Sequence, residues 1–194
     1  MEFLARFEEI DGTLFRFDTR IYLNAYDPAS DGNCVGAIIG KNPGSASPKV
    51  MSKLAALELG GDKMLPTVRN RFLDGYKLAN KRVPENAFVR VWNLFYICDP
   101  NFYSASEKAM YASELTNCET ENEATPIVWY GWGGPDKRLN QFKERFTARK
   151  YPIEFHYDHH NSCVRNCSPS LDSFAKHTQG MPAKPVAEYL SHVL

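Results

Sequence analysis

The chain has 194 residues, of which 43% are hydrophobic and 24% are charged, and its 23 Lys and Arg residues balance 23 Asp and Glu residues. This length suits one domain, residues 1–194, that buries its own core, and no run approaches the about 18 apolar residues of a membrane span. Proteins that bind duplex nucleic acid nonspecifically carry a basic excess, so we expect neither membrane insertion nor strong nonspecific duplex binding.

The N-terminus and the cysteines both favour an unexported protein. The segment MEFLARFEEIDG is acidic and amphipathic, and it lacks the basic start and apolar run of a secretory signal. The five cysteines are an odd, scattered set, which is atypical of a disulfide framework. We therefore expect a cytoplasmic protein with mostly reduced thiols.

The first half of the chain predicts strands followed by helices. Thr13–Leu23 alternates apolar and polar residues, which indicates an N-terminal β-hairpin. Asn33–Gly40, NCVGAIIG, is a compact apolar run typical of a strand buried in a parallel sheet. Lys49–Leu59 and Thr67–Asn80 have helical apolar spacing, so we expect one or two helices to cross over to the next strand.

The second half alternates strands with helices. The expected strands are Ala87–Phe95, Pro126–Gly134 and Ile153–Asp158, and the expected helices are Ser106–Leu115, Lys137–Ala148 and Pro185–Leu194. Strands that alternate with helices over such lengths form right-handed βαβ units. The predicted fold class is therefore α/β, a three-layer α/β/α sandwich with a mainly parallel central sheet, plus the N-terminal β-hairpin.

Loops that leave the carboxyl ends of the predicted strands are candidates for a binding site, because ligands of open parallel sheets bind there. The first such loop consists of Gly40, Lys41, Asn42, Pro43, Gly44 and Ser45. Its glycines permit close backbone approach, and the Asn42 amide can both donate and accept hydrogen bonds. Asn, Pro and Gly are also the commonest turn residues, so an ordinary turn fits the same pattern.

Two later segments carry further candidate side chains. Trp132 and Gly133, in WYGWGG, could provide a stacking surface for a planar ligand, whereas core packing is the alternative role for such a tryptophan. Ser173–Pro185 is polar and punctuated by Gly and Pro, so we expect a surface loop before the last helix. His177 in this loop is a candidate contact for an anion bound near the helix N-terminus.

Potential zinc ligands gather in HYDHHNSCVRNC, namely His156, His159, His160, Cys163 and Cys167. Imidazoles and thiolates are the usual ligands of Zn²⁺. Their spacing matches no standard zinc motif, and Asn161 with Ser162 predicts a turn instead of a helix that would align the two thiols. Zinc is therefore an alternative, and the sequence indicates no other cofactor.

Several motifs, taken in order, resemble an uncharacterised bacterial and phage family, the domain of unknown function 1643. That family has Asn-Pro-Ser after a strand, then Asp-Pro-Thr-Ile-Arg-Arg, Val-Asn-Leu-Phe, a Trp-Gly strand end, and Gly-x-Pro-x-His-Pro before the last helix. The counterparts here are Asn42-Pro43-Gly44, Leu65-Pro66-Thr67-Val68-Arg69, Trp92-Asn93-Leu94-Phe95, Trp132-Gly133 and Gly180-Met181-Pro182-Ala183-Lys184-Pro185. The departures that bear on chemistry are Gly44, where the family has Ser, and Lys184, where the family has His.

The same layout is similar to the uracil-DNA glycosylase superfamily, whose mismatch-specific members have Gly-Ile-Asn-Pro-Gly where this chain has Gly40-Lys41-Asn42-Pro43-Gly44. This resemblance implies a uracil-DNA-glycosylase-like fold with a pocket at the strand ends. It also implies that Asn42 orients a water molecule, Asn93 reads or braces a base, and Lys184 stabilises a developing anion. Arg69 and Trp132 would line the same pocket.

Three functional hypotheses follow. The first is an enzyme that acts on a nucleobase, nucleotide or nucleic acid, with hydrolysis of a glycosidic bond as its specific form. The second is a noncatalytic module that binds a nucleotide or another small ligand. The third is a zinc-stabilised or partner-binding domain in which the His/Cys cluster is structural. Fold resemblance alone does not choose among them.

Overall fold

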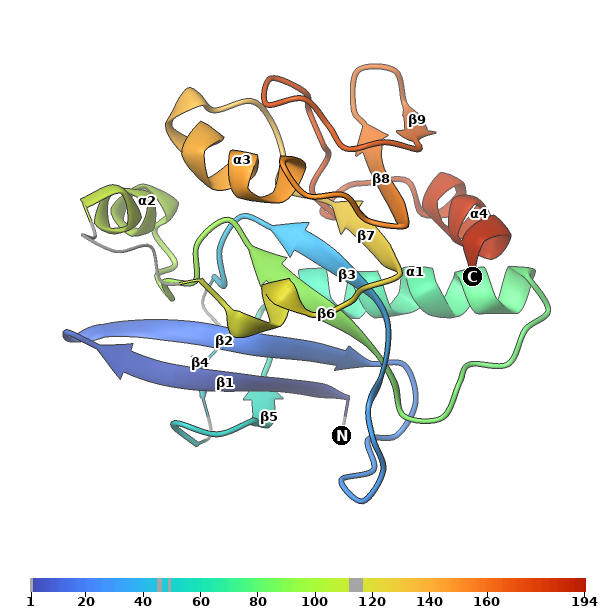
Figure 1. Ribbon diagram of the computed structural model, residues 1–194, viewed down its shortest axis with the longest axis horizontal. Coiled ribbons are helices and arrows are strands. Elements are labelled where there is room, and N and C mark those ends of the chain that lie inside the picture. Colours follow the sequence, from blue (N-terminus) through green and yellow to red (C-terminus); the bar gives the residue numbers. More distant parts are fainter. Residues whose placement is uncertain (1, 45–46, 49, 112–116) are drawn as a thin grey trace.

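The computed structural model describes residues 2–44, 47–48, 50–111 and 117–194 (Figure 1). The strands in these residues are β1 (Phe3–Ile10), β2 (Thr13–Tyr22), β3 (Asn33–Gly40), β4 (Ser47–Pro48), β5 (Ala55–Glu58), β6 (Ala87–Asn93), β7 (Ile127–Tyr130), β8 (Ile153–Asp158) and β9 (Cys163–Arg165). The helices are α1 (Met64–Leu78), α2 (Phe102–Tyr111), α3 (Asn140–Thr147) and α4 (Ala183–Val193), with short 3₁₀ helices at Glu119–Asn122 and Lys137–Leu139. The expectation of an α/β fold is confirmed.

The described strands pair in the order β4-β5-β1-β2-β6-β3-β7-β8-β9. Four neighbouring strands, β6, β3, β7 and β8, run parallel to one another. The β1–β2 hairpin adds to β6 in antiparallel orientation, and β9 pairs with β8 in the same way. The sheet is therefore mixed and not mainly parallel, because the hairpin continues the sheet at the β6 edge and is no separate appendage.

The helix expected over Lys49–Leu59 is wrong for the described part of that segment. Ala55–Glu58 forms β5 instead, and its first two residues pair with Leu4 and Ala5 of β1. A strand partner from the distant N-terminus thus overrides the local helical spacing. Lys49 itself lies outside the described residues, as do residues 112–116 at the end of the expected helix Ser106–Leu115.

Helix α1 begins at a side-chain cap. The Asp62 carboxylate accepts hydrogen bonds from Met64 N at 2.7 Å and Leu65 N at 3.2 Å, which satisfies two amides of the first turn. Leu65 and, further along, Phe72 then turn their side chains into the core.

Among the residues that the structure describes, no helix is long and apolar enough to cross a membrane.

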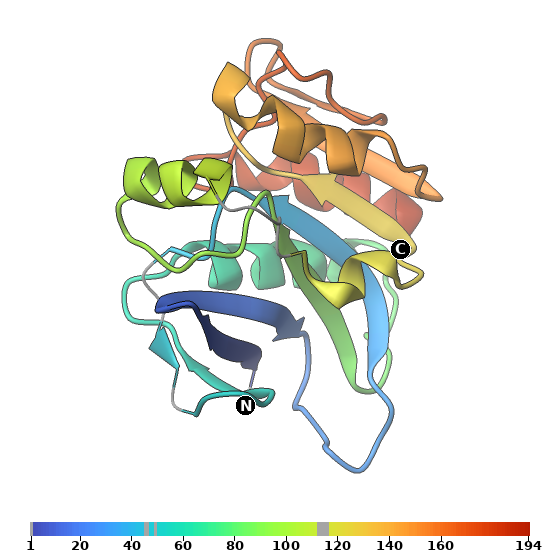
Figure 2. The same ribbon diagram turned by 60° about the vertical axis from the view of Figure 1, so that its left-hand side comes forward.

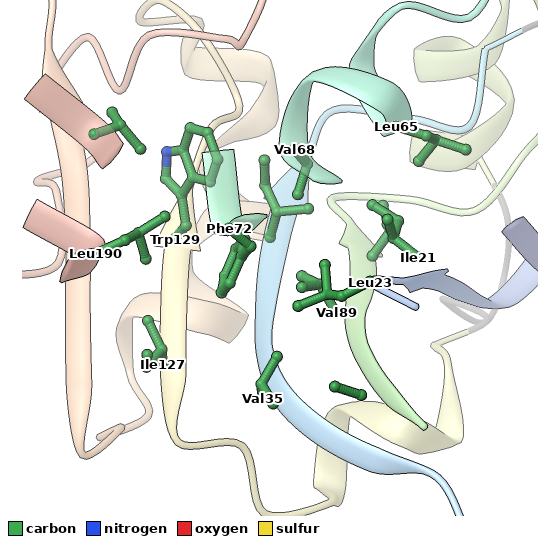
Figure 3. Close-up of a cluster of buried hydrophobic side chains, with 14 of the residues drawn as sticks. Ile21, Leu23, Val35, Leu65, Val68, Phe72, Val89, Ile127, Trp129 and Leu190 are labelled. Carbon is green, nitrogen blue, oxygen red and sulfur yellow. The ribbon is translucent and has the colours of Figure 1, made fainter. Parts of the chain in front are cut away.

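In the described residues, the core has two large apolar clusters on opposite faces of the sheet, and a third, small cluster contains Leu4, Tyr22 and Phe88. Ile38 belongs to the cluster that contains Phe72 of α1 and Leu190 of α4, and Figure 3 shows these helix side chains beside β7. The next residue, Ile39, belongs to the cluster that contains Phe142 of α3. Successive strand residues face opposite sides of a sheet, so one apolar strand supplies both clusters. Figure 2 shows α3 in front of the parallel strands and α1 with α4 behind them.

Candidate functional site

The parallel strands create a crevice between the carboxyl ends of β3 and β7. After β3 the chain runs through β4, β5 and α1 to β6, which pairs with β3 on the side away from β7. After β7 the chain runs to β8, which pairs with β7 on the side away from β3, so the two outgoing loops diverge. Ligands of open α/β sheets bind at such a switch point. A pocket of about 410 Å³ lies between these loops, lined by Lys41, Asn42, Phe102, Gly133, Gly134, Phe174, His177 and Gln179.

Asn42 is anchored so that its amide oxygen is available to a ligand. Its Nδ2 donates to the backbone oxygen of Asp99 at 3.2 Å, whereas its Oδ1 accepts no hydrogen bond from a described residue. The adjacent Pro43 is buried, and Gly44 has φ +69°, a conformation that favours glycine. Ser45, the last residue of the predicted loop, lies outside the described residues.

Lys41 contributes a positive charge that the described protein does not neutralise by an ion pair. Its Nζ lies 4.7 Å from the centre of the Phe102 ring, a cation–π distance. Burial lowers the pKa of Lys41, an effect that Asp136 opposes and Arg138 reinforces. Gly133 makes room for this side chain, because a Cβ at its φ of +92° would lie 3.1 Å from Lys41 Cε.

The loop before α4 reaches the pocket through backbone pairing. Gly133 N donates to Ala175 O at 2.7 Å, and Lys176 N donates to Tyr157 O at 2.9 Å, so this loop joins the ends of β7 and β8. Phe174 is fixed on its outer side by the His159 ring, whose centre is 4.4 Å away. These contacts hold Phe174 and His177 at the pocket wall.

His177, which lines the pocket, has a defined tautomer. Its Nδ1 accepts a hydrogen bond from Gln179 N at 3.3 Å, which assigns the proton of the neutral ring to Nε2. Burial lowers the pKa of His177, and the charge of Lys41 lowers it further, while Asp62 acts in the opposite direction. His177 is therefore a neutral hydrogen-bond donor at neutral pH.

The lining of the pocket selects for a particular ligand chemistry. It offers an ammonium group, an imidazole, two amide side chains and two phenyl rings, and no carboxylate is among the described lining residues. Phenyl rings favour planar groups, while an unneutralised lysine favours negative charge. The arrangement therefore suits a planar ligand that carries an anionic or carbonyl-rich group.

Four predicted site residues lie elsewhere or face the core. Lys184 is exposed in a groove between α1 and α4 and pairs with Glu188 at 3.6 Å. Arg69 donates to the backbone oxygens of Tyr22 and Leu23, which ties α1 to β2. Trp132 and Asn93 are completely buried and do not line the pocket. Asn93 packs against Gly40, where an added Cβ would lie 3.0 Å from Asn93 Oδ1.

The five predicted zinc ligands are all described; Cys167 is exposed, and the other four make local contacts. His156 Nδ1 donates to Cys167 O at 3.0 Å, and burial lowers the pKa of His156. His159 and His160 both pack against the ring of Phe174. Cys163 lies on β9, where it pairs with Asp158 of β8. In the described part of the chain, no group of three or more His, Cys, Asp or Glu side chains is arranged to hold a metal ion.

The sequence patterns did not identify the two phenyl rings of the pocket. Phe102 directly follows the loop after β6, so its position at a predicted carboxyl end was an available signal. Phe174 carries no such signal, because it reaches the pocket through the pairing of Ala175 with Gly133. Comparison of the chain with protein-family models, with curated proteins and with solved structures found no match.

Proposed function

We propose that the pocket between β3 and β7 binds a nucleobase-containing anion, such as a nucleotide, and hydrolyses its N-glycosidic bond. The observation that carries this proposal is the convergence of Asn42, Lys41 and His177 in a pocket with two phenyl rings and no described carboxylate. The parallel strand order β6-β3-β7-β8, with helices on both faces, supports the three-layer, uracil-DNA-glycosylase-like layout that the sequence resemblance implies.

Each group has a role that its geometry supports. The free Oδ1 of Asn42 accepts a hydrogen bond from a water molecule and orients it toward the sugar carbon. The water oxygen bonds to that carbon, the carbon–nitrogen bond breaks, and its electron pair leaves with the base. His177 Nε2 donates a hydrogen bond to the negative charge that develops on the base. The proton released by the water ends on the departing base.

Lys41 and the two phenyl rings provide binding energy. A base that stacks on an aromatic side chain gains about 1–3 kcal/mol, and Phe102 and Phe174 are the rings available. The ammonium group of Lys41 attracts the phosphate or the base anion, and its partial burial reduces solvent screening. Gln179 supplies a further amide at the rim.

A noncatalytic binding module is the second candidate function. The observation that favours it is the same lining without a described carboxylate. A carboxylate activates water as a general base more strongly than the Asn42 amide can. In that function the pocket retains its ligand unchanged, and Asn42 serves only as a hydrogen-bonding contact.

The test combines a base-release assay with ligand-dependent thermal stability. Purified protein is incubated with nucleosides, nucleotides and short single-stranded oligonucleotides, and released base is quantified by chromatography. We expect Asn42→Ala to lower base release by about 100-fold or more while the same substrate still raises its melting temperature. Lys184→Ala is the matched control and keeps the full rate, since Lys184 lies outside the pocket.

Three results decide between the candidate functions. A selective thermal shift without base release by the wild-type protein establishes the binding module and rejects hydrolysis. Equal base release by wild type and Asn42→Ala removes the proposed role of Asn42. A flat thermal panel across all base-containing ligands rejects both functions for this pocket.

A further inference from the structure

Arg16 is the most unusual charged residue among those described. It lies on β2 with 1% of its surface exposed, and neither Nε nor Nη1 has a hydrogen-bond partner. Arginine stays protonated in proteins, so this site holds a buried positive charge without an ion pair. Arg90, on the adjacent strand β6, is also buried but donates to Thr125 at 3.2 Å and pairs with Glu123.

A second unpaired polar side chain leaves the sheet on the same face. Asn93 is fully buried, and neither its Nδ2 nor its Oδ1 has a hydrogen-bond partner. Residues two apart along a strand face the same side of the sheet. Arg16 therefore shares a face with Leu14, and Asn93 shares a face with Val91, and both apolar residues belong to the cluster on the α1 side. The two orphaned side chains therefore face α1 from the adjoining strands β2 and β6.

The surroundings enclose this centre at the carboxyl edge of the sheet. Arg16 N donates to Tyr96 O at 2.9 Å, which places Arg16 beside the chain that leaves β6. Met64 at the start of α1 and Asn93 both approach Gly40, since a Cβ there would lie 3.4 Å from Met64 Sδ and 3.0 Å from Asn93 Oδ1. The titratable groups that act on Arg16 are Cys98 and Asp62, and neither forms an ion pair with it. Burial raises the pKa of the Cys98 thiol to about 11, so Asp62 is the one that carries a charge at neutral pH.

The centre adjoins the pocket on the Asn42 side. Asn42 is held by the backbone oxygen of Asp99, the residue after Cys98. The Asp62 carboxylate acts electrostatically on both Arg16 and His177. Asn93 lies against Gly40, two residues before Asn42, so this end of the centre is close to the pocket, although neither Arg16 nor Asn93 lines it.

We propose that Arg16 and Asn93 bind a small oxyanion, a carboxylate or a phosphate, in a centre behind the Asn42 wall of the pocket. An uncompensated buried cation is costly to a folded protein, and an oxyanion would supply the missing negative charge together with acceptors for the guanidinium and for Asn93 Nδ2. The inference does not depend on the glycosidic reaction, because it uses two residues outside the base pocket.

The test measures melting temperature against anion concentration in extensively dialysed protein. Sodium phosphate and sodium acetate are compared with sodium chloride at equal ionic strength, after overnight incubation because the centre is buried. We expect one of the two oxyanions to raise the melting temperature of the wild type saturably, by about 5 °C or more at 100 times its dissociation constant. The oxyanion that saturates identifies whether the centre takes a phosphate or a carboxylate.

Four variants assign the effect to its residues. Arg16→Met loses the saturable shift, and without oxyanion it melts higher than the wild type because an unpaired buried charge is gone. Arg16→Lys retains the charge but saturates at higher concentration, which tests the centre even if Arg16→Met folds poorly. Arg90→Met, the matched control, keeps the shift and melts lower because it loses real partners. Lys41→Met also keeps the shift.

Three outcomes overturn the inference. They are the absence of any saturable shift in the wild type, an equal shift in wild type and Arg16→Met, and a shift that Lys41→Met removes. The last result would assign anion binding to the base pocket instead, and it would support the proposed function while rejecting the buried centre.

Discussion

At the residue scale, the pocket depends on a cationic lysine, Lys41, that lowers the tendency of the nearby His177 to hold a proton. Lys41 has no ion pair with a described residue, and its charge adds to burial in lowering the pKa of His177. A neutral His177 can donate through Nε2 while its Nδ1 accepts from Gln179 N. The pairing thus explains why an imidazole in this pocket acts as a donor without carrying a charge.

This interaction predicts the pH dependence of His177. Because its folded pKa lies below the unfolded value of about 6.5, the unfolded chain binds more protons as pH falls, so His177 decreases stability below about pH 6.5 and has no effect above it. Histidine signals in NMR titrations should give a midpoint below 6.5, and Lys41→Met should raise that midpoint. His177→Gln should lose the corresponding decrease in stability. A midpoint that Lys41→Met leaves unchanged would contradict the coupling.

At the element scale, the crossing of α1 and α4 is set by a glycine. Gly75 lies in the buried face of α1, and a Cβ there would meet Leu190 Cβ at 2.8 Å and Leu194 Cδ1 at 3.0 Å. The first of these atoms is attached to the α4 backbone, so rotation of a side chain cannot relieve the contact. The close approach of two helices therefore requires a residue without a side chain at this position.

This contact reverses the usual effect of a helical glycine substitution. Replacing an interior helical glycine by alanine ordinarily stabilises by about 0.5–1 kcal/mol, but Gly75→Ala must separate the two helices and should destabilise by about 1–3 kcal/mol. Urea unfolding measures the change. Lys77→Ala, on the exposed side of the same helix, is the control and should stay within about 0.5 kcal/mol of the wild type. A stabilised Gly75→Ala would show that the helices have room to spare.

At the scale of the whole molecule, one buried carboxylate joins three parts of the chain. Glu121 accepts a hydrogen bond from Tyr96 Oη at 2.6 Å and pairs with Arg145 of α3 at 2.9 Å. Arg145 also donates to the backbone oxygens of Asn93 and Leu94 at the end of β6. Burial and the adjacent carboxylate raise the pKa of Tyr96, which therefore stays a donor. The network fixes α3 against the strand that ends beside the candidate site.

Removing this carboxylate should weaken the whole fold. Glu121→Ala leaves Arg145 and Tyr96 without their shared partner, so we expect a loss of about 3–5 kcal/mol in the free energy of unfolding. Glu119→Ala is the control, because Glu119 is exposed and its ion pair in the described residues is with Arg6, and it should cost about 1 kcal/mol or less. Comparable effects of the two substitutions in urea unfolding would show that the network adds little to stability.

The sequence by itself determined most of the local elements, although not β5, and one edge of the candidate site. The strand Asn33–Gly40 has the bounds that its apolar run predicts, and Asn42 and Lys41 follow it into the pocket, because burial on both faces and turn chemistry are local properties. The apolar spacing of the last residues also predicted helix α4. Lys184, at the start of this helix, lies in the groove between α1 and α4 and not in the candidate site.

Only the tertiary structure decided how distant segments meet. The β1–β2 hairpin joins β6, β5 pairs with β1 in place of a helix, and the Gly133–Ala175 pairing brings Phe174 and His177 to the pocket. The same folding leaves Arg16 and Asn93 buried on adjacent strands without partners. Backbone pairing between distant strands depends on which edges remain free after folding, and that information is not contained in the periodicity of any single segment.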